Sequence, residues 1–470
     1  MVVFRLVFFN FLFRLLMQAF HYWQNLGAAM SLLSVLPFAG LILLIAILPF
    51  FPAAACWWEK HSNKFKVALV CAVGGILLYC MPTGDMSKIW ITYLEYAAFL
   101  ALLASLFVIS GGIHISGAFA GFPYINTIFL AIGAVLASLL GTTGASMVMI
   151  RPLLRANRQR QHKAHIVIFF IFIVSNCGGL LTPLGDPPLY LGFLRGVPFD
   201  WTLRLAPQWF LTNCLLLFVF YVFDAWYFRR EADHMRATLS GEIKMAKRKI
   251  HIQGWINVLF LLGIMGVILA AGYFIYPVLV RYRGCLAAEI TSKIFQIIMM
   301  GVLACGSYRL TSARIRSENE FTFAPIREVA ILFFGIFGAM IPALALLEAK
   351  SQLMALREPW QFFWMSGSLS SVLDNAPTYL VYATLAASQN HLAAIHLGDL
   401  AAQFPALLAA ISCGTVFMGA ITYIGNGPNF MVKSVAEHAR VKMPSFGGYL
   451  LWSGAILIPI FILQTYIFFR

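Results

Sequence analysis

The residues of this chain best suited to ion chemistry are two aspartates, Asp186 and Asp374, each inside a segment that is otherwise apolar. A carboxylate removed from water holds a proton unless a cation compensates its charge. A proton and a metal cation therefore compete for such a group, and this competition is a sufficient physical basis for exchange. Because acids within apolar spans are rare, ion binding is the first hypothesis for both aspartates.

Small polar residues near the two acids offer further oxygen ligands. A hard monovalent cation needs several oxygens, which the free carbonyls of an unwound helix and nearby polar side chains supply. The ligand candidates are Ser175, Asn176, Thr182, Thr142, Thr143, Asn375, Thr422 and Asn426. The only metal expected is the transported sodium, and no cofactor is expected.

Structural roles for the aspartates stay open beside this hypothesis. Asp186 precedes Pro187, so its carboxylate could cap a helix whose first turn holds proline. Asp374 and Asn375 could form an ordinary turn before Pro377. Neither role excludes ion binding.

The same motifs interrupt apolar segments in both halves of the chain. A shift of 240 positions places Thr182 on Thr422 and Asp186 on Asn426. Glycine and proline weaken or remove backbone hydrogen bonds that lipid cannot replace, so these clusters predict unwound helices. The residues expected to break or bend the backbone are Gly178, Gly179, Pro183, Gly185, Pro377, Gly425 and Pro428. Paired breaks in the two halves of a membrane protein indicate a transporter's binding site.

The elements that must position these residues are membrane helices. Hydrophobic residues make up 61% of the chain, charged residues 11%, and the mean hydropathy is +0.83, which indicates more apolar surface than a soluble protein of this length could bury. We count about ten to twelve apolar runs long enough to cross a bilayer, broken ones included. The net charge of +15 lies in short runs between them. This distribution is typical of cytoplasmic loops rather than of nucleic-acid binding, and it predicts a multi-pass protein of the inner (cytoplasmic) membrane.

The charge pattern predicts an all-α polytopic fold of two inverted repeats, each with a re-entrant hairpin and a broken helix. A shift of 233 positions, which sets Ser138 against Ser371, relates the two hairpins. The expected divisions are an apolar or amphipathic segment 1–30, a first repeat 31–228 with hairpin 125–154 and broken helix 164–190, a basic cytoplasmic linker 229–252, and a second repeat 253–470 with hairpin 360–386 and broken helix 404–432.

Three segments, SNCGG at 175–179, TPLGD at 182–186 and SVLDNAP at 371–377, resemble the signature pair of NhaD-type sodium/proton antiporters. These belong to the ion-transporter superfamily, which also holds citrate and dicarboxylate carriers. The resemblance implies an ion site between hairpin tips and broken helices, elevator-type movement and a homodimer. The chain departs from the antiporter pattern at Pro187 and Pro188, which weakens the assignment of a substrate but not of the superfamily.

The sequence therefore favours a secondary active transporter, first a sodium/proton antiporter, with a sodium- or proton-coupled carrier of citrate or a similar organic anion as the alternative. It carries no P-loop, HExxH or GxSxG motif, so we do not expect an enzyme. Glu95, a single acid in an apolar run, fits a membrane interface as well as an ion path. Arg151 is interpreted as a cytoplasmic anchor rather than a contact for an anionic substrate.

Overall fold

The computed structural model describes residues 32–48, 54, 57–58, 60–83, 86–116, 121–231, 251–319, 321–350, 356–393 and 396–470. The expected N-terminal segment 1–30 and most of the expected linker 229–252 lie outside the described residues.

The described chain is helical, as the sequence predicts, apart from one short antiparallel strand pair. Strands β1 (His114–Ser116) and β2 (His251–Gln253) pair with Ile115 opposite Ile252. The helices of the first half are η1 (Leu32–Val35), α2 (Leu36–Ile47), α4 (His61–Thr83), α5 (Ser87–Ser110), α6 (Pro123–Leu140), α7 (Thr142–Ala156), α8 (Ala164–Ile173), η3 (Cys177–Leu181), α9 (Pro187–Leu194), η4 (Phe199–Leu205) and α10 (Ala206–Arg229). Those of the second half are α12 (Ile256–Leu269), η5 (Ala270–Ile275), α13 (Tyr276–Arg283), α14 (Cys285–Leu310), α15 (Ala313–Glu318), α16 (Ala324–Lys350), α17 (Pro359–Ser370), α18 (Asn375–Gln389), α19 (Leu397–Gln403), α20 (Pro405–Met418), η7 (Gly419–Ile421), α21 (Gly427–His438) and α22 (Phe446–Phe468).

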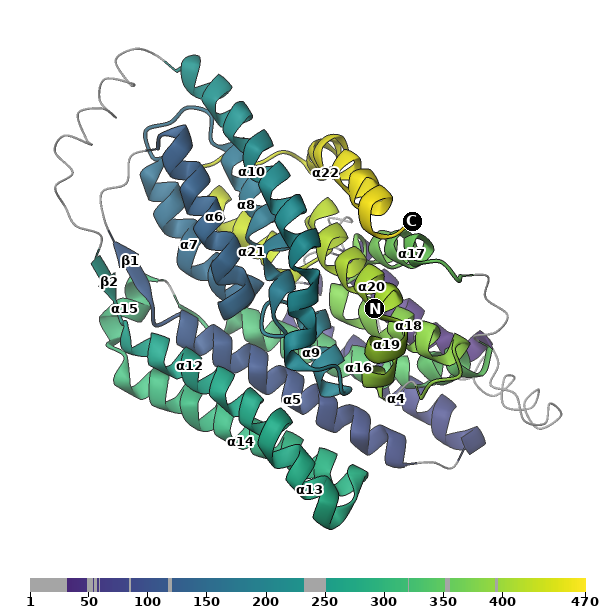
Figure 1. Cartoon of the computed structure of the whole chain (residues 1–470). Helices are drawn as coiled ribbons and strands as arrows, with labels where there is room; N and C mark the ends of the chain where they lie inside the picture. The colour runs from purple at the N-terminus through teal and green to yellow at the C-terminus, as the bar shows by residue number, and fades with distance from the viewer. Residues whose placement is uncertain are drawn as a thin grey trace, which may run out of the picture.

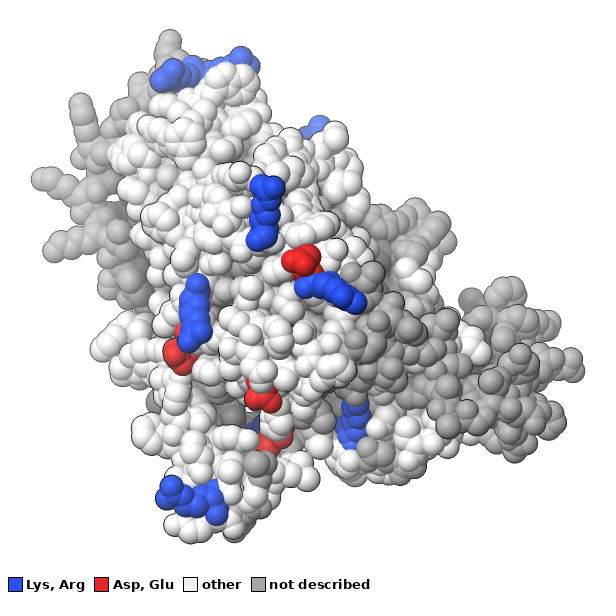
Figure 2. All heavy atoms as spheres, turned by 45° about the vertical axis from the view of Figure 1, so that its right-hand side comes forward, with Lys and Arg blue, Asp and Glu red and all other residues white. Residues whose placement is uncertain are grey.

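Helices long and apolar enough to cross a membrane run through the whole described chain. Nine pass this test among the described residues, or ten if the bent pair of α19 with α20 counts as one more span. Space-filling atoms show a face on which uncharged side chains predominate (Figure 2). The protein is a multi-pass membrane protein, because these helices carry their apolar residues outward as well as inward.

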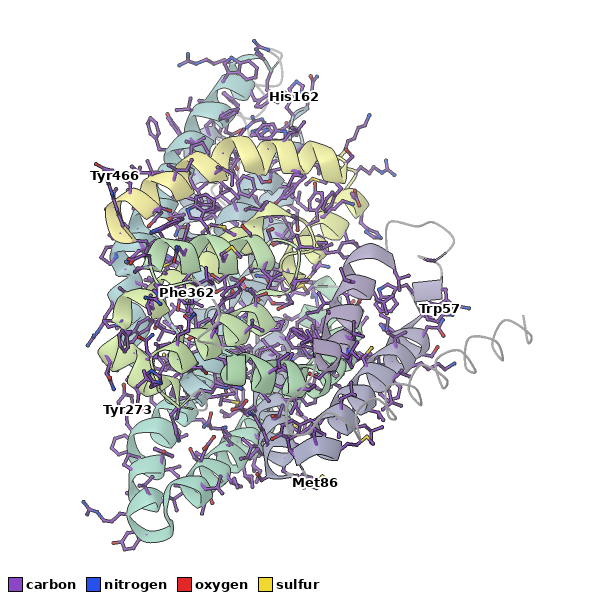
Figure 3. All side chains as sticks on the ribbon, turned by 90° about the vertical axis from the view of Figure 1, so that its right-hand side faces the viewer. Trp57, Met86, His162, Tyr273, Phe362 and Tyr466 are labelled. Atoms are coloured by element: carbon purple, nitrogen blue, oxygen red, sulfur yellow. The ribbon has the colours of Figure 1, made fainter. Side chains whose placement is uncertain are left out.

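The helices form two groups that meet along α5 and α16. Helices α5, α12 and α14 lie side by side, and α4 packs along α16 (Figure 1). The second group contains α6 to α10 together with α17 to α22. The side view places His162 at one end of the molecule and Met86 and Tyr273 towards the other (Figure 3).

Two interruptions of the helical backbone lie in the second group. After α8 and η3, Thr182 adopts an extended conformation (φ −137°, ψ 157°), and Asp186 does so again (φ −144°, ψ 144°) before α9 begins. After α20 and η7, Thr422 (φ −127°, ψ 164°) and Asn426 (φ −149°, ψ 140°) repeat this conformation before α21. The two segments therefore share the same extended conformation at both matched positions.

Two glycines make the tight turns of this region sterically feasible. Gly141, between α6 and α7, has φ +79°, which residues with a side chain rarely adopt. A Cβ on Gly425 would lie 2.6 Å from the carbonyl oxygen of Gly419, so the second interruption also needs a residue without a side chain.

Candidate functional site

Asp186 is the centre of a buried polar cluster that joins both halves of the chain. Asp186 is only 1% exposed. Thr142 Oγ1 donates to Asp186 Oδ1 at 2.9 Å, and Asn426 Nδ2 donates to the same oxygen at 3.4 Å. Asn375 Nδ2 donates to Asp186 Oδ2. Four residues that the sequence marks as candidates, from four different segments, therefore lie together.

All four residues stand where a helix begins. Thr142 and Asn375 are the first residues of α7 and α18, and Asp186 and Asn426 precede α9 and α21. Each of these N-terminal helix ends is preceded in its own turn or break by a C-terminal helix end. Helix ends carry roughly half a charge of opposite sign, and the N-terminal ends are the ones that lie at Asp186 itself. Asp186 is the one ionisable group among these four residues.

Among the described residues, only neutral groups donate to Asp186. Although the residue occupies the N-cap position of α9, its carboxylate accepts no capping hydrogen bond. Among the described residues no Lys or Arg forms an ion pair with it. A negative charge buried without a cation is unfavourable, so the site is suited to a proton or a monovalent cation.

Asn375 offers an additional oxygen at this point. Its Oδ1 atom is buried and has no hydrogen-bond partner among the residues that the structure describes, while its Nδ2 atom donates to Asp186. A buried amide oxygen without a donor is costly, and a cation would satisfy it. One carboxylate and one free amide oxygen thus stand side by side.

Ser175 and Asn176 extend the cluster on the side of α8. The Ser175 carbonyl accepts from Asn426 Nδ2 at 3.1 Å, and Asn176 Oδ1 accepts from the same amide at 3.2 Å. Asn176 Nδ2 donates to Asn429 Oδ1 at 2.7 Å. The sequence interpretation did not include Asn429, although it lies three residues after Asn426 and hence on the same side of α21.

Thr182 and Thr422 have the same structural task in the two halves. Thr182 Oγ1 donates to the Ser138 carbonyl of α6, and Thr422 Oγ1 donates to the Ser371 carbonyl at 2.5 Å. Each hydroxyl also accepts from the backbone two residues later, at 3.2 Å in both cases. These threonines therefore tie each break to its neighbouring helix pair, and neither donates to Asp186.

Asp374 has a different role from Asp186 in the structure. Its carboxylate accepts from the backbone N–H of Ala376 at 3.2 Å and so caps α18. The residue is half-buried rather than enclosed. Among the hydrogen bonds of the described residues, none joins the Asp374 side chain to the Asp186 cluster. The sequence left an ordinary turn open for Asp374, whereas in the structure the residue is the N-cap of α18.

A small pocket lies on the other side of Asp186, facing α5. It is lined on one side by apolar residues of α5, including Phe99 and Phe107, and on the other by Thr142, Thr143 and Asp186. Its volume of ≈ 20 Å³ is enough for about one water-sized particle. Thr143 thus faces the pocket without belonging to the Asp186 hydrogen bonds.

The expected backbone-breaking residues lie at the breaks and helix starts. Gly178 offers its carbonyl to Trp209 Nε1 at 3.0 Å, and Gly179 and Gly185 lie in contact. Pro377 is in the first turn of α18, and Pro428 in that of α21, where a missing N–H costs nothing. Pro183 lines the pocket.

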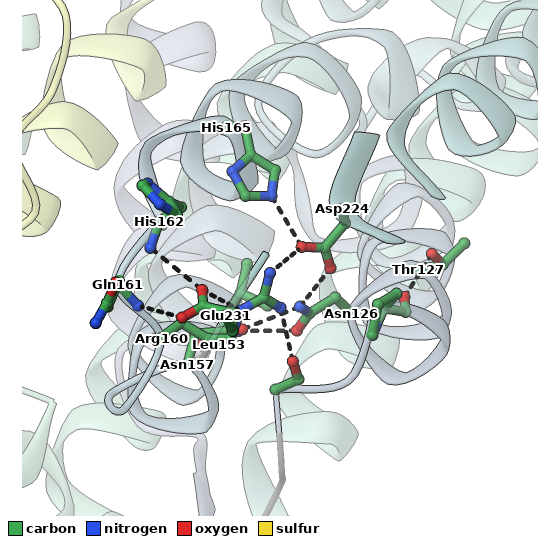
Figure 4. Close-up of polar contacts among 12 residues, drawn as sticks. Asn126, Thr127, Leu153, Asn157, Arg160, Gln161, His162, His165, Asp224 and Glu231 are labelled. Atoms are coloured by element: carbon green, nitrogen blue, oxygen red, sulfur yellow. Dashed lines mark hydrogen bonds and ion pairs between the residues drawn. The ribbon is translucent and has the colours of Figure 1, made fainter. Parts of the chain in front are cut away.

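A second polar cluster lies at the N-terminal end of α6 and the C-terminal end of α7, and it was not expected from the sequence. Asp224 Oδ1 accepts from Arg160 and from His165, each at 2.8 Å, and Asp224 Oδ2 accepts from Asn126 at 2.8 Å (Figure 4). Arg160 also pairs with Glu231 at 3.2 Å, with both side chains fully enclosed. The basic run around Arg160 has the pattern of a solvated loop, but this arginine is buried and fastens the helix pair to α10.

Arg151 donates to the carbonyl of Asn319 and not to the Asp186 cluster. Its interpretation as a cytoplasmic anchor stays a prediction.

Comparison with protein families gives one finding. A family model described as "Putative citrate transport" matches residues 27–469, nearly the whole chain. No curated protein sequence matches the chain.

Proposed function

The chain belongs to the family described as "Putative citrate transport", and we propose that it is a secondary transporter that couples movement of a citrate-like anion to a proton or monovalent cation bound at Asp186. The observation that carries the proposal is the environment of Asp186, which is 1% exposed and, within the described part of the chain, accepts hydrogen bonds from Thr142, Asn375 and Asn426 only.

The coupling follows from charge balance at this carboxylate. An uncompensated Asp186 opposes its own burial, and either a proton or a cation such as sodium removes that opposition. The two ligands exclude each other because they neutralise the same group. The unpartnered Oδ1 of Asn375 favours a metal cation, since it can serve as a ligand but not as a proton carrier at neutral pH.

We propose further that the two halves are inverted repeats and move as an elevator. In this proposal the helix pairs α6–α7 and α17–α18 are re-entrant hairpins. These hairpins and the two breaks move together against α5 and α14. The matched dihedral angles of Thr182 and Thr422, and their matched bonds to Ser138 and Ser371, support the repeat. The basic loops lie in the cytoplasm of an inner-membrane protein.

Sodium/proton exchange without an organic anion is the second candidate function. The small volume beside Asp186 favours it, because ≈ 20 Å³ admits an ion but not a tricarboxylate in this conformation. A site with one carboxylate and neutral amides is sufficient for such exchange.

Proteoliposomes distinguish the two functions and test the role of Asp186. Uptake of labelled citrate is compared with the response of an internal pH dye to sodium or lithium, for the wild-type chain and for Asp186→Asn. We expect citrate uptake driven by an ion gradient in the wild type and none above background in the variant. Equal coupled transport by both proteins would refute the proposal, and ion exchange without citrate uptake would favour the second candidate.

A further inference from the structure

Four buried or half-buried charged residues lie where the two groups of helices meet. Glu95 of α5 accepts from Arg195, which follows α9, at 3.2 Å, and from Lys293 of α14 at 3.4 Å. Lys293 also pairs with Glu289 of its own helix at 2.6 Å. The two cations bind the two different oxygens of Glu95. One carboxylate is thus held between two cations that come from opposite sides of the boundary.

This cluster lies close to the Asp186 pocket. Glu95 precedes the pocket residue Phe99 by four residues on α5, about 6 Å along a helix axis. Arg195 follows the pocket residue Tyr190 by five residues at the end of α9. Tyr190 Oη also donates to Gln296, one turn from Lys293 on α14, at 3.1 Å. The cluster therefore lies about one helical turn beyond the pocket wall.

The other buried lysine and arginine side chains of the described chain bind groups other than Glu95. Five Lys and Arg residues are buried among the described residues: Lys64, Arg160, Arg195, Lys293 and Arg316. Arg160 pairs with Asp224 and Glu231 near the C-terminal end of α7. Lys64 pairs with Glu328 between α4 and α16. Arg316 donates to carbonyls of Val108 and Ser307. Of these five cations, Arg195 and Lys293 are the two that pair with Glu95, one helical turn from the pocket residue Phe99.

We infer that Arg195 and Lys293 form the binding site for a carboxylate group of the transported anion, and that Glu95 occupies this site when the anion is absent. The inference rests on the proposed function and names the residues that recognise its anionic substrate. An arginine and a lysine that converge on one carboxylate are a favourable receptor for another. In the present state Glu95 provides the carboxylate that the site is shaped to hold.

Displacement of Glu95 must leave the cluster electrically balanced. When a substrate carboxylate takes both cations, Glu95 is a buried acid without a cation and takes up a proton. Among the described residues, the other charged group of the cluster is Glu289 on α14, which stays with Lys293. Helix α18 contributes two uncharged groups, Thr384 at 3.4 Å from Arg195 and the hydroxyl group of Tyr379, which also interacts with this arginine. One carboxylate and one proton therefore enter the cluster together.

The test measures the equilibrium dissociation constant of citrate for the purified protein in detergent, without any gradient. Arg195→Gln removes a ligand of the anion and should weaken citrate binding by about tenfold or more, while Arg195→Lys should weaken it less. Glu95→Gln removes the internal competitor and should instead strengthen citrate binding and lessen its dependence on pH. Glu95→Asp, which keeps the charge but shortens its reach, should act in the same direction and serves if Glu95→Gln does not fold.

The opposite signs separate recognition from a structural ion pair. If Glu95 and Arg195 only hold α5 and α9 together, both variants will lose stability and citrate affinity alike, and the inference is overturned. Glu328→Gln breaks the ion pair to Lys64 far from the pocket and should leave the citrate affinity unchanged. It therefore controls for the general effect of breaking an ion pair between helices.

The result also distinguishes failure of this inference from failure of the proposed function. Wild-type protein that exchanges sodium for protons through Asp186 but binds no citrate would overturn the inference and leave the ion site intact. Citrate binding that depends on Arg195 but not on sodium or Asp186 would support the anion site and refute coupling at Asp186.

Discussion

The two breaks of this protein have nearly the same backbone but different charge. Thr182 and Thr422 are extended and donate to a carbonyl of the adjacent helix pair. Four residues later the first break has Asp186 and the second has Asn426, again with matching dihedral angles. The duplicated geometry thus carries a carboxylate in one copy and an amide in the other.

This difference shows what each copy contributes to the site. Because Asn426 donates to Asp186, the second break supplies a hydrogen bond to the charge of the first rather than a second charge. Two carboxylates at this separation would repel each other, and one would hold a proton over a wide pH range. A single aspartate leaves one negative charge, which one proton or one monovalent cation neutralises.

The largest effect is expected from moving this charge between the breaks. Asp186→Asn should reduce cation-coupled transport to background, because no carboxylate then remains in the cluster. Addition of Asn426→Asp restores one carboxylate at the matched position and should return roughly a tenth of the activity, about 1.4 kcal/mol short of the wild type. Coupled uptake in proteoliposomes is the measurement. A double variant no better than Asp186→Asn would show that the two positions are not interchangeable.

Asn426→Asp alone should have the next largest effect. It places a second acid within hydrogen-bond distance of Asp186, so the pair should bind one proton more tightly than Asp186 does alone. We expect the pH profile of cation-dependent transport to shift upwards by about one unit or more, since the proton must leave before a cation binds. Asn426→Ser, which adds no charge, is the control. A profile unchanged in the aspartate variant would contradict direct contact between the two side chains.

The residue types in the sequence predicted where the two breaks lie, but not which residues contact them. Glycine, proline and threonine at 240 positions' separation were visible, because few residue types permit extended backbone inside apolar segments. The helical, multi-pass membrane architecture was predicted from the hydropathy and is confirmed. The re-entrant nature of the helix pairs stays a prediction, and α6 is by length and composition able to cross a membrane.

Pairing across the chain explains what the sequence could not show. Arg160 belongs to a run of basic residues that is typical of a solvated loop, and its burial depends on Asp224 and Glu231 more than sixty positions away. Glu95 is a lone acid in its own segment, and only the approach of α9 and α14 supplies its two cations. Such long-range contacts leave no local pattern in one sequence.

Smaller and equal effects are expected from the two threonines. Thr182→Val and Thr422→Val each remove a hydroxyl that donates to one carbonyl and accepts from the backbone, and each should cost about 1–3 kcal/mol of stability. Thermal unfolding in detergent gives the stability, and coupled uptake gives the activity. The two variants should differ from each other by less than either differs from the wild type. A strongly unequal pair would break the structural equivalence of the two copies.

The smallest effect is expected at Asp374, the second acid that the sequence marked. A shift of 233 positions sets Asp374 on Gly141, the residue before α7, so the first copy begins its helix without a charge. Asn is as good an N-cap as Asp, and Asp374→Asn should therefore change stability by no more than about 0.5 kcal/mol and transport by about twofold or less. Asp374→Ala removes the cap of Ala376 and should cost about 1 kcal/mol with little further loss of coupling. If Asp374→Asn abolished coupled uptake as fully as Asp186→Asn, its carboxylate would have to bind the transported ion in a state other than the one seen here, and the charge of the site would be two rather than one.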